Sequence, residues 1–174
     1  MQRRGGLPTD HPEPVSTTWS LSFQQVEQAN PAAADLLRLC AWLAPDAIPE
    51  EIITQGAAEP GPELGPVLTP AASDPFKLNE AIEVLQKFSL LRRDPETKVL
   101  SMHRLVQAVL QDGMDNALQR TWAERVVRVV SRVFPRVDFA TWRQCQRYLP
   151  QALVCTALIE EWAMAFPGSG EALS

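Results

Sequence analysis

A chain of 174 residues with 45% hydrophobic and 21% charged residues has the composition of a globular protein, which excludes disorder along its whole length. Its formal net charge of -5 argues against bulk electrostatic attraction to nucleic acid or to acidic membranes, although charge is uneven along the chain. No run approaches the roughly 18 apolar residues of a membrane span, and the first residues lack the apolar core of a signal peptide.

The first third of the chain predicts a leader followed by helices. Residues 1–14 predict a flexible leader, because Gly and Pro are frequent and apolar residues are nearly absent. Apolar and polar residues alternate over residues 15–23, which predicts an extended segment that becomes helical around Phe23. Asn30 followed by Pro31 predicts a helix start, since Asn caps free amides and Pro fits the first helical turn. The spacing predicts a wide buried face on that helix, formed by Leu36, Leu37, Leu39, Cys40 and Leu43.

Two further helices with an insertion between them are expected next. The acids after Pro49 complement the positive end of a short helix, which Gly56 ends. Residues 56–73 are rich in Pro, Gly and Ala and predict a loop longer than is usual between packed helices. Asp74-Pro75 predicts the start of the third helix, and its apolar positions follow the i, i+3, i+4, i+7 spacing of a buried face. These positions are Leu78, Ala81, Ile82, Leu85 and Phe88.

A β-hairpin and a helical tail complete the expected fold. Residues 90–93 and 98–101 flank the turn-forming sequence Asp-Pro-Glu-Thr, which predicts a two-stranded hairpin. Helices followed by a small hairpin are typical of a winged helix. The tail is expected to form a helix that ends near Gly113, a long helix closed by Pro135, and two more helices separated at Pro150.

These elements define the expected fold class and domains. We expect a mainly α protein: a winged-helix domain with a small β-hairpin wing at residues 15–114, followed by a helical linker or bundle at residues 115–166. A flexible tail is expected at residues 167–174.

His103 is the main candidate functional residue. The chain has two histidines, and the other, His11, lies in the leader. His103 follows the hairpin and begins an apolar-periodic helix, where a structural role at the surface is the ordinary alternative to a functional one. The sequence has neither a Gly-x-x-x-x-Gly-Lys-Ser/Thr phosphate loop nor a Gly-x-Ser-x-Gly nucleophile motif, so we expect no enzyme activity from this chain alone.

The cysteines indicate neither a disulfide framework nor a metal site. Cys40, Cys145 and Cys155 are odd in number, widely spaced and set in apolar helical patterns. We therefore expect buried thiols in a cytoplasmic protein and no bound metal.

Five segments in this order resemble a known family. They are Trp-Ser-Leu-Ser-Phe at 19–23, Leu-Leu-Arg-Leu-Cys-Ala-Trp-Leu at 36–43, Ile-Pro-Glu-Glu-Ile-Ile at 48–53, Leu-Gln-Lys-Phe-Ser-Leu-Leu at 85–91 and Met-His-Arg-Leu-Val at 102–106. Together they resemble the winged-helix (ARC2) domain of the NB-ARC branch of the STAND signalling NTPases. The tail resembles the linker of bacterial members that continue into tetratricopeptide repeats.

The resemblance implies a role for His103. In that family, the His of a Met-His-Asp motif contacts the diphosphate of ADP bound in the neighbouring NTPase domain and holds the protein closed. Met102 and His103 match this motif, whereas Arg104 stands where the motif has Asp. The imidazole chemistry is suitable, because a ring nitrogen can donate a hydrogen bond to a phosphate oxygen.

The resemblance also implies cofactors and partners. The parent protein would be an ATPase that binds ADP or ATP with magnesium, and this chain itself would bind no cofactor. Its partners would be the NTPase domain upstream and helical repeats downstream, with a homo-oligomer in the activated parent and no membrane.

Two other functions remain open on the sequence. A winged helix can bind duplex DNA, and Arg92, Arg93 and Lys98 make the hairpin basic. Glu80 and Glu83 on the exposed face of the preceding helix would oppose phosphate, which disfavours nucleic acid. A protein-interaction scaffold is the other alternative.

Overall fold

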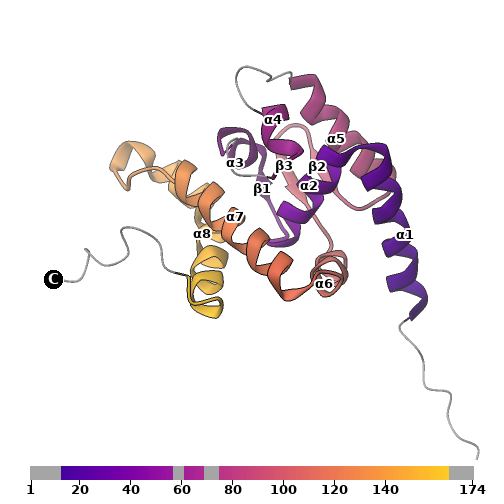
Figure 1. The fold of residues 1–174 in the computed structure, drawn as a ribbon. Helices are drawn as coiled ribbons and strands as arrows, with labels where there is room; N and C mark the ends of the chain where they lie inside the picture. The colour runs from indigo at the N-terminus through magenta and orange to yellow at the C-terminus, as the bar shows by residue number, and fades with distance from the viewer. Residues whose placement is uncertain (1–12, 57–60, 69–74, 165–174) are drawn as a thin grey trace, which may run out of the picture.

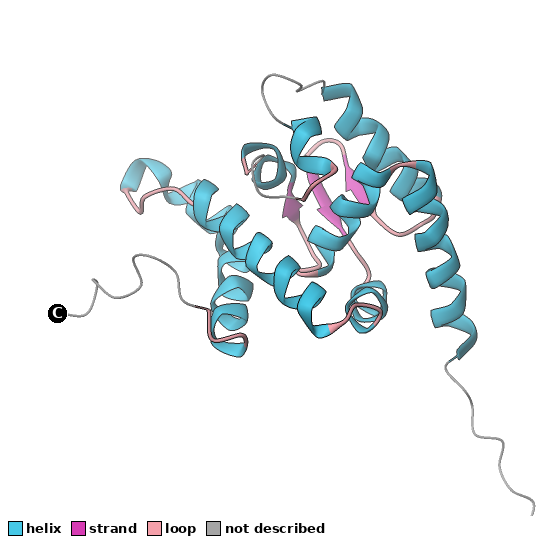
Figure 2. Ribbon diagram, in the orientation of Figure 1, coloured by secondary structure: helices cyan, strands magenta, loops and turns pink. Residues whose placement is uncertain are grey.

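The computed structural model describes residues 13–56, 61–68 and 75–164, which form helices around one small sheet (Figures 1 and 2). The helices are α1 (Glu13–Ala29), α2 (Pro31–Ala41), α3 (Glu50–Gln55), α4 (Leu64–Leu68), α5 (Pro75–Lys87), α6 (Arg104–Asp112), α7 (Asn116–Val133) and α8 (Trp142–Glu161). The strands are β1 (Ile48–Pro49), β2 (Arg92–Asp94) and β3 (Val99–Ser101), and a 3-10 turn, η1 (Phe139–Thr141), precedes α8. The expected mainly α-helical class is confirmed.

Helix α2 is the central element of the fold. Asn30 caps it by accepting the N–H of Ala33 at 3.0 Å, and Pro31 occupies its first turn, as expected. It packs against α1, α4, α5, α6 and α7 (Figure 1). Nine of its eleven residues are buried, which is why almost no polar face remains on this helix.

Helix α1 corrects the expectation of an extended segment at residues 15–23. The apolar residues Trp19, Phe23 and Val26 recur at i, i+4 and i+7, and this helical period determines the structure. Val26 is fully buried, and the two aromatic side chains pack against the core from the same face. Leu21, which the alternating pattern placed with them, is 56% exposed on the other face. The leader expected at residues 1–14 overlaps the start of α1, and residues 1–12 lie outside the described residues.

The sheet contains the expected hairpin and one strand that the sequence did not reveal. Strands β2 and β3 pair antiparallel, and β1 pairs antiparallel with β3 to give the order β1-β3-β2. Ile48 of β1 lies opposite Leu100 of β3, and both side chains are fully buried. A strand of two residues that ends in Pro49 has no detectable alternation, so only its pairing with β3 reveals it.

The insertion expected as a loop at residues 56–73 contains helix α4. Gly56 ends α3 as expected. Asp35 of α2, which is buried, accepts the backbone N–H groups of Glu63 (2.8 Å) and Leu64 (3.2 Å) at the start of α4. Leu64 is fully buried against this contact, so a tertiary interaction orders a segment whose composition predicts a loop. Residues 57–60 and 69–74, including the expected cap Asp74, lie outside the described residues.

Helix α8 corrects the expected break at Pro150. It runs as one helix through the proline, although an interior proline removes a hydrogen bond and costs about 3 kcal/mol. Buried residues on both sides of Pro150 hold the helix against α7, as the adjacent ribbons in Figure 1 show. They include Cys145, Tyr148, Gln151, Cys155 and Leu158. The expected tail at residues 167–174 lies outside the described residues.

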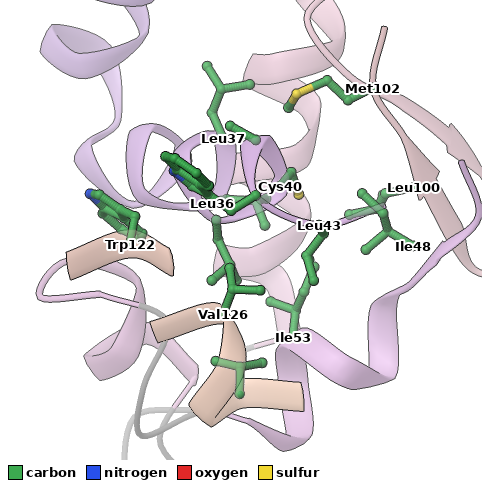
Figure 3. Close-up of a cluster of buried hydrophobic side chains, with 14 of the residues drawn as sticks. Leu36, Leu37, Cys40, Leu43, Ile48, Ile53, Leu100, Met102, Trp122 and Val126 are labelled. Atoms are coloured by element: carbon green, nitrogen blue, oxygen red, sulfur yellow. The ribbon is translucent and has the colours of Figure 1, made fainter. Parts of the chain in front are cut away.

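The hydrophobic core joins the sheet side and the tail side of α2 (Figure 3). Leu36 on α2 lies close to Trp122 and Val126 of α7, whereas Leu37 lies on the side of α2 away from α7. The expected α5 residues Leu78, Ala81, Ile82 and Leu85 are all buried. Within the described ranges, no helix is both long enough and apolar enough to cross a lipid bilayer.

Candidate functional site

His103 is held at the N-terminus of α6 by its neighbours on both sides. Met102 is 4% exposed, and its backbone N–H donates to the carbonyl of Pro45 at 2.9 Å, which anchors the end of β3 to the core. His103 has an extended backbone conformation and is the N-cap residue of α6. Its position is therefore fixed by a buried methionine before it and a helix after it.

The imidazole ring of His103 itself caps α6. Its Nδ1 accepts the backbone N–H of Leu105 at 3.2 Å. A ring nitrogen that accepts a hydrogen bond carries no proton, so in the neutral ring the proton lies on Nε2. The side chain is exposed, which leaves the Nε2–H as a donor toward a ligand outside the module.

An open groove of about 740 Å³ lies beside His103. Arg92 of β2 and Ser101 of β3 are cross-strand partners, so their side chains lie on the same face of the hairpin. Ser101 precedes His103 by two residues, which brings Arg92 to the same groove. The lining residues are Asp46, Gln86, Ser89, Leu91, Arg92, Arg93, Ser101, Met102 and His103.

The three basic residues of the hairpin have different environments. Arg93 forms a two-bond ion pair with Glu50, from Nε to Oε1 at 2.6 Å and from Nη2 to Oε2 at 2.8 Å, and its Nη1 donates to Asn79 Oδ1. The hydrogen bonds to Glu50 raise the pKa of Arg93 further above its usual value. Lys98 lies in the turn at the other end of the hairpin, with φ of 51°. Only Arg92 combines exposure with a place in the His103 groove.

Arg104, which replaces the aspartate of the Met-His-Asp motif, faces solvent. Its Nη2 lies 3.9 Å from Asp46 Oδ2, and both side chains are 82% exposed. An exposed pair at this distance contributes little to stability. Asp46 is nevertheless the carboxylate that lines the groove in the described part of the chain, so Arg104 partly balances its charge.

Glutamine side chains connect α6 to the rest of the module. Gln107 Nε2 donates to the carbonyls of Cys40 (2.9 Å) and Leu43 (2.8 Å), and Gln111 Nε2 donates to the carbonyl of Ala41 at 2.7 Å. These bonds supply side-chain donors to carbonyl groups at and just after the C-terminus of α2. Helix α6, which begins at His103, is thereby joined to the central helix.

Helix α8 is connected to the same region from the other side. Gln151 is fully buried, and its side chain accepts the N–H of Ala44 at 2.8 Å and donates to the Ala44 carbonyl at 3.3 Å. Arg147 forms an ion pair with Glu51 of α3 and donates to the carbonyl of Thr97 in the hairpin turn. The tail helices therefore contact the part of the fold that carries His103.

Sequence reasoning found His103 and Arg92 but did not bring them together, and it missed Ser89, Ser101 and Gln86. The expected turn at residues 94–97 would place Arg92 opposite Val99. In the structure Asp94 pairs with Val99, so the loop is residues 95–98 and Arg92 lies opposite Ser101. The glutamines were also missed. Of these glutamines, Gln107 has a signal in the sequence, because it lies next to Val106 on the face of α6 that is buried.

The described ranges show neither a candidate metal site nor an exposed cysteine thiol. They contain no cluster of His, Cys, Asp and Glu residues that could hold a metal ion. Cys40, Cys145 and Cys155 are free and buried. Desolvation by burial raises the pKa of Cys40 and that of Cys155 to about 12, which keeps both thiols protonated at neutral pH.

Comparison with known proteins places this geometry in context. A family model described as a domain of unknown function (DUF7779) matches residues 24–119, which is more than half of the chain. The chain is 27% identical over 142 residues to a protein named "Nucleotide-binding leucine-rich repeat (NLR)-like protein" from Hyaloscypha variabilis. The match covers 80% of this chain but only 12% of that relative. No solved structure matches the chain significantly.

Proposed function

The chain belongs to the family defined by the domain of unknown function DUF7779, and we propose that it is a regulatory winged-helix module of a longer STAND-type signalling NTPase. The module couples the ADP or ATP state of an upstream NTPase domain to conformational switching and oligomerisation. A relative named as a nucleotide-binding, NLR-like protein, of which the match covers 12%, supports a longer parent.

The order of the elements supports the winged-helix assignment. Helix α2, strand β1, helices α3 and α5, and the β2-β3 hairpin follow one another along the chain. Strand β1 joins the hairpin on the β3 side, which makes a three-stranded sheet beside the helices. Helix α4 is an insertion between α3 and α5, held by Asp35, and leaves this order unchanged.

The observation that carries the proposed function is the hydrogen bond that the exposed His103 ring accepts at Nδ1. Nδ1 is occupied by the N–H of Leu105, and the side chain is exposed. A neutral imidazole in this position presents its Nε2–H to the outside, where it can donate to a phosphate oxygen of ADP in the neighbouring domain. A hydrogen bond to a charged phosphate is roughly twice as strong as one between neutral groups.

Loss of this contact on exchange of ADP for ATP would release the module. A coupling of about 1 to 3 kcal/mol changes nucleotide affinity by about 5-fold to 150-fold, which one charge-assisted contact and its neighbours can supply. The bonds from Gln107 and Gln111 to α2 and from Gln151 to Ala44 would make α6, α2 and α8 move as one body. Release at His103 would then reposition the helices downstream.

The test is the rate of ADP release from the longer protein. We expect His103→Asn to accelerate release of labelled ADP by about 5-fold or more, because Asn keeps the cap of α6 but lacks the outer ring nitrogen. His11→Asn, which removes the other histidine, is the matched control and should leave the rate unchanged. Equal rates of ADP release from the His103→Asn variant and the wild type would refute the proposed contact between His103 and ADP.

A further inference from the structure

We propose that Arg92 and His103 form one anion site that binds a diphosphate through two side chains. The inference rests on the proposed function and extends it, because the family motif includes His103 but not the hairpin arginine. The residues Arg92, His103, Ser89 and Ser101 all line one groove, and the donors of the proposed site are the Arg92 guanidinium, the His103 Nε2–H and the two serine hydroxyl groups.

The register of the hairpin brings the two side chains together. Arg92 lies opposite Ser101 in the antiparallel pair, and residues opposite each other in such a pair face the same side of the sheet. Arg93, the next residue, also lines the groove, but its guanidinium is bound to Glu50 and Asn79. His103 follows Ser101 after one buried residue, so both donors open to the same groove.

The charges around the groove favour an anion. Arg92 is exposed and has no ion-pair partner in the part of the chain that the structure describes, whereas Arg93 is neutralised by Glu50. Asp46 is the acidic lining residue, and its carboxylate lies 3.9 Å from the guanidinium of Arg104. A guanidinium without a carboxylate partner can bind two phosphate oxygens in parallel.

Ser89 supports the site through its backbone conformation. It ends α5 in a Schellman motif, with its N–H on the carbonyl of Gln86 and the N–H of Leu90 on the carbonyl of Leu85. Its φ of 56° is a left-handed conformation that glycine adopts without strain. A serine at this position places a hydroxyl at the groove where a glycine would have none.

The groove fits a compact diphosphate better than a DNA duplex. Binding to a duplex needs basic groups spread along the backbone. Lys98 lies at the far end of the hairpin, Arg93 is occupied, and the exposed acids Glu80 and Glu83 lie on α5. Arg92 and His103 instead line one open groove of about 740 Å³.

The test is titration of the 174-residue chain with inorganic pyrophosphate at constant ionic strength, monitored by calorimetry and by the NMR signals of the His103 ring. We expect Arg92→Gln and His103→Asn each to weaken binding by about tenfold. Lys98→Gln, which removes the same charge from the other end of the hairpin, should weaken it less than twofold. Arg92→Lys should fall in between, because it keeps the charge but not the parallel bonds.

Several results would overturn the two-residue site. They are no pyrophosphate binding by the wild type, equal weakening by Lys98→Gln and Arg92→Gln, or salt-sensitive binding of duplex DNA in preference to pyrophosphate. Weakening by His103→Asn alone would remove Arg92 from the site and leave the proposed function intact. Conversely, pyrophosphate binding could need both residues while His103→Asn leaves ADP release from the longer protein unchanged. That result would support the two-residue anion site and refute the proposed role of His103 in holding ADP.

Discussion

The Nδ1 atom of His103 accepts the backbone N–H of Leu105 at 3.2 Å, so the side chain proposed to contact a nucleotide also caps the helix that it begins. The two roles use different ring nitrogens. Substitutions can therefore separate them, because an asparagine can cap the helix without extending as far as an imidazole.

The two roles of His103 predict different effects of two substitutions on stability. His103→Ala should lower the free energy of unfolding by about 1 kcal/mol, because the Leu105 amide loses its cap. His103→Asn should keep stability within about 0.5 kcal/mol of the wild type. Urea denaturation of both variants followed by circular dichroism measures the difference, and a module that fails to fold with alanine would indicate a larger structural role for His103.

The buried amide of Gln151 predicts that α8 is docked rather than loosely attached. Gln151→Ala should cost about 1 to 3 kcal/mol, since the backbone groups of Ala44 lose their partners in a buried site. The exposed Gln146, five residues earlier on α8, provides the matched control and should change stability by less than about 0.5 kcal/mol. Hydrogen exchange of the α8 amides would report the loss locally, and equal protection in both variants would contradict the docking.

The close approach of Gly61 to Asp35 and Trp122 predicts that a side chain at position 61 lowers the stability of the protein. Its φ is +131°, and a Cβ there would lie 2.5 Å from Asp35 Oδ2 and 2.8 Å from the Trp122 ring. Gly61→Ala should therefore destabilise the protein by more than about 1 kcal/mol. Gly113→Ala, in an ordinary helical conformation, should cost less. The thermal midpoints of the two variants test this order.

Two buried cysteines predict a pH dependence of stability and reactivity. Burial raises the pKa of Cys40 and that of Cys155 to about 12. The unfolded chain ionises these thiols near their ordinary value of about 8.5, whereas the folded protein does not. Their contribution to stability is therefore complete below that pH and decreases as the pH rises toward 12.

Alkylation with iodoacetamide at pH 8.5, resolved by mass spectrometry for each cysteine, tests the same point. Cys40 and Cys155 should react only at the rate at which the protein opens, and urea near the unfolding midpoint should accelerate both. Rapid labelling of either thiol in the native protein would show that it is not buried.

The sequence predicted the elements whose signals are local. Asn30-Pro31 identified the start of α2, the spacing of Leu78, Ile82 and Leu85 identified α5, and the turn sequence identified the hairpin. Each signal depends on residues within one or two turns of chain. The position of His103 between β3 and α6 followed from the same local information.

The sequence failed where tertiary contacts decide the structure. Helix α1 forms because Trp19, Phe23 and Val26 pack against the hydrophobic core, although the alternation around them suggested an extended chain. Helix α4 depends on Asp35, which lies 28 residues before Glu63. The arginine at position 92 joins His103 only through the pairing of two strands, so the site required the fold and could not be read from either residue alone.

The most direct test of the central claim is the affinity of this chain for the separated nucleotide-binding domain of the proposed longer protein, loaded with ADP or with ATP. Linkage requires that a module which retains ADP is bound more tightly by the ADP form, by the same factor. We predict at least about fivefold preference for the ADP form, abolished by His103→Asn and unchanged by His11→Asn. Equal affinity for the two nucleotide forms, or a preference that survives His103→Asn, would contradict the account.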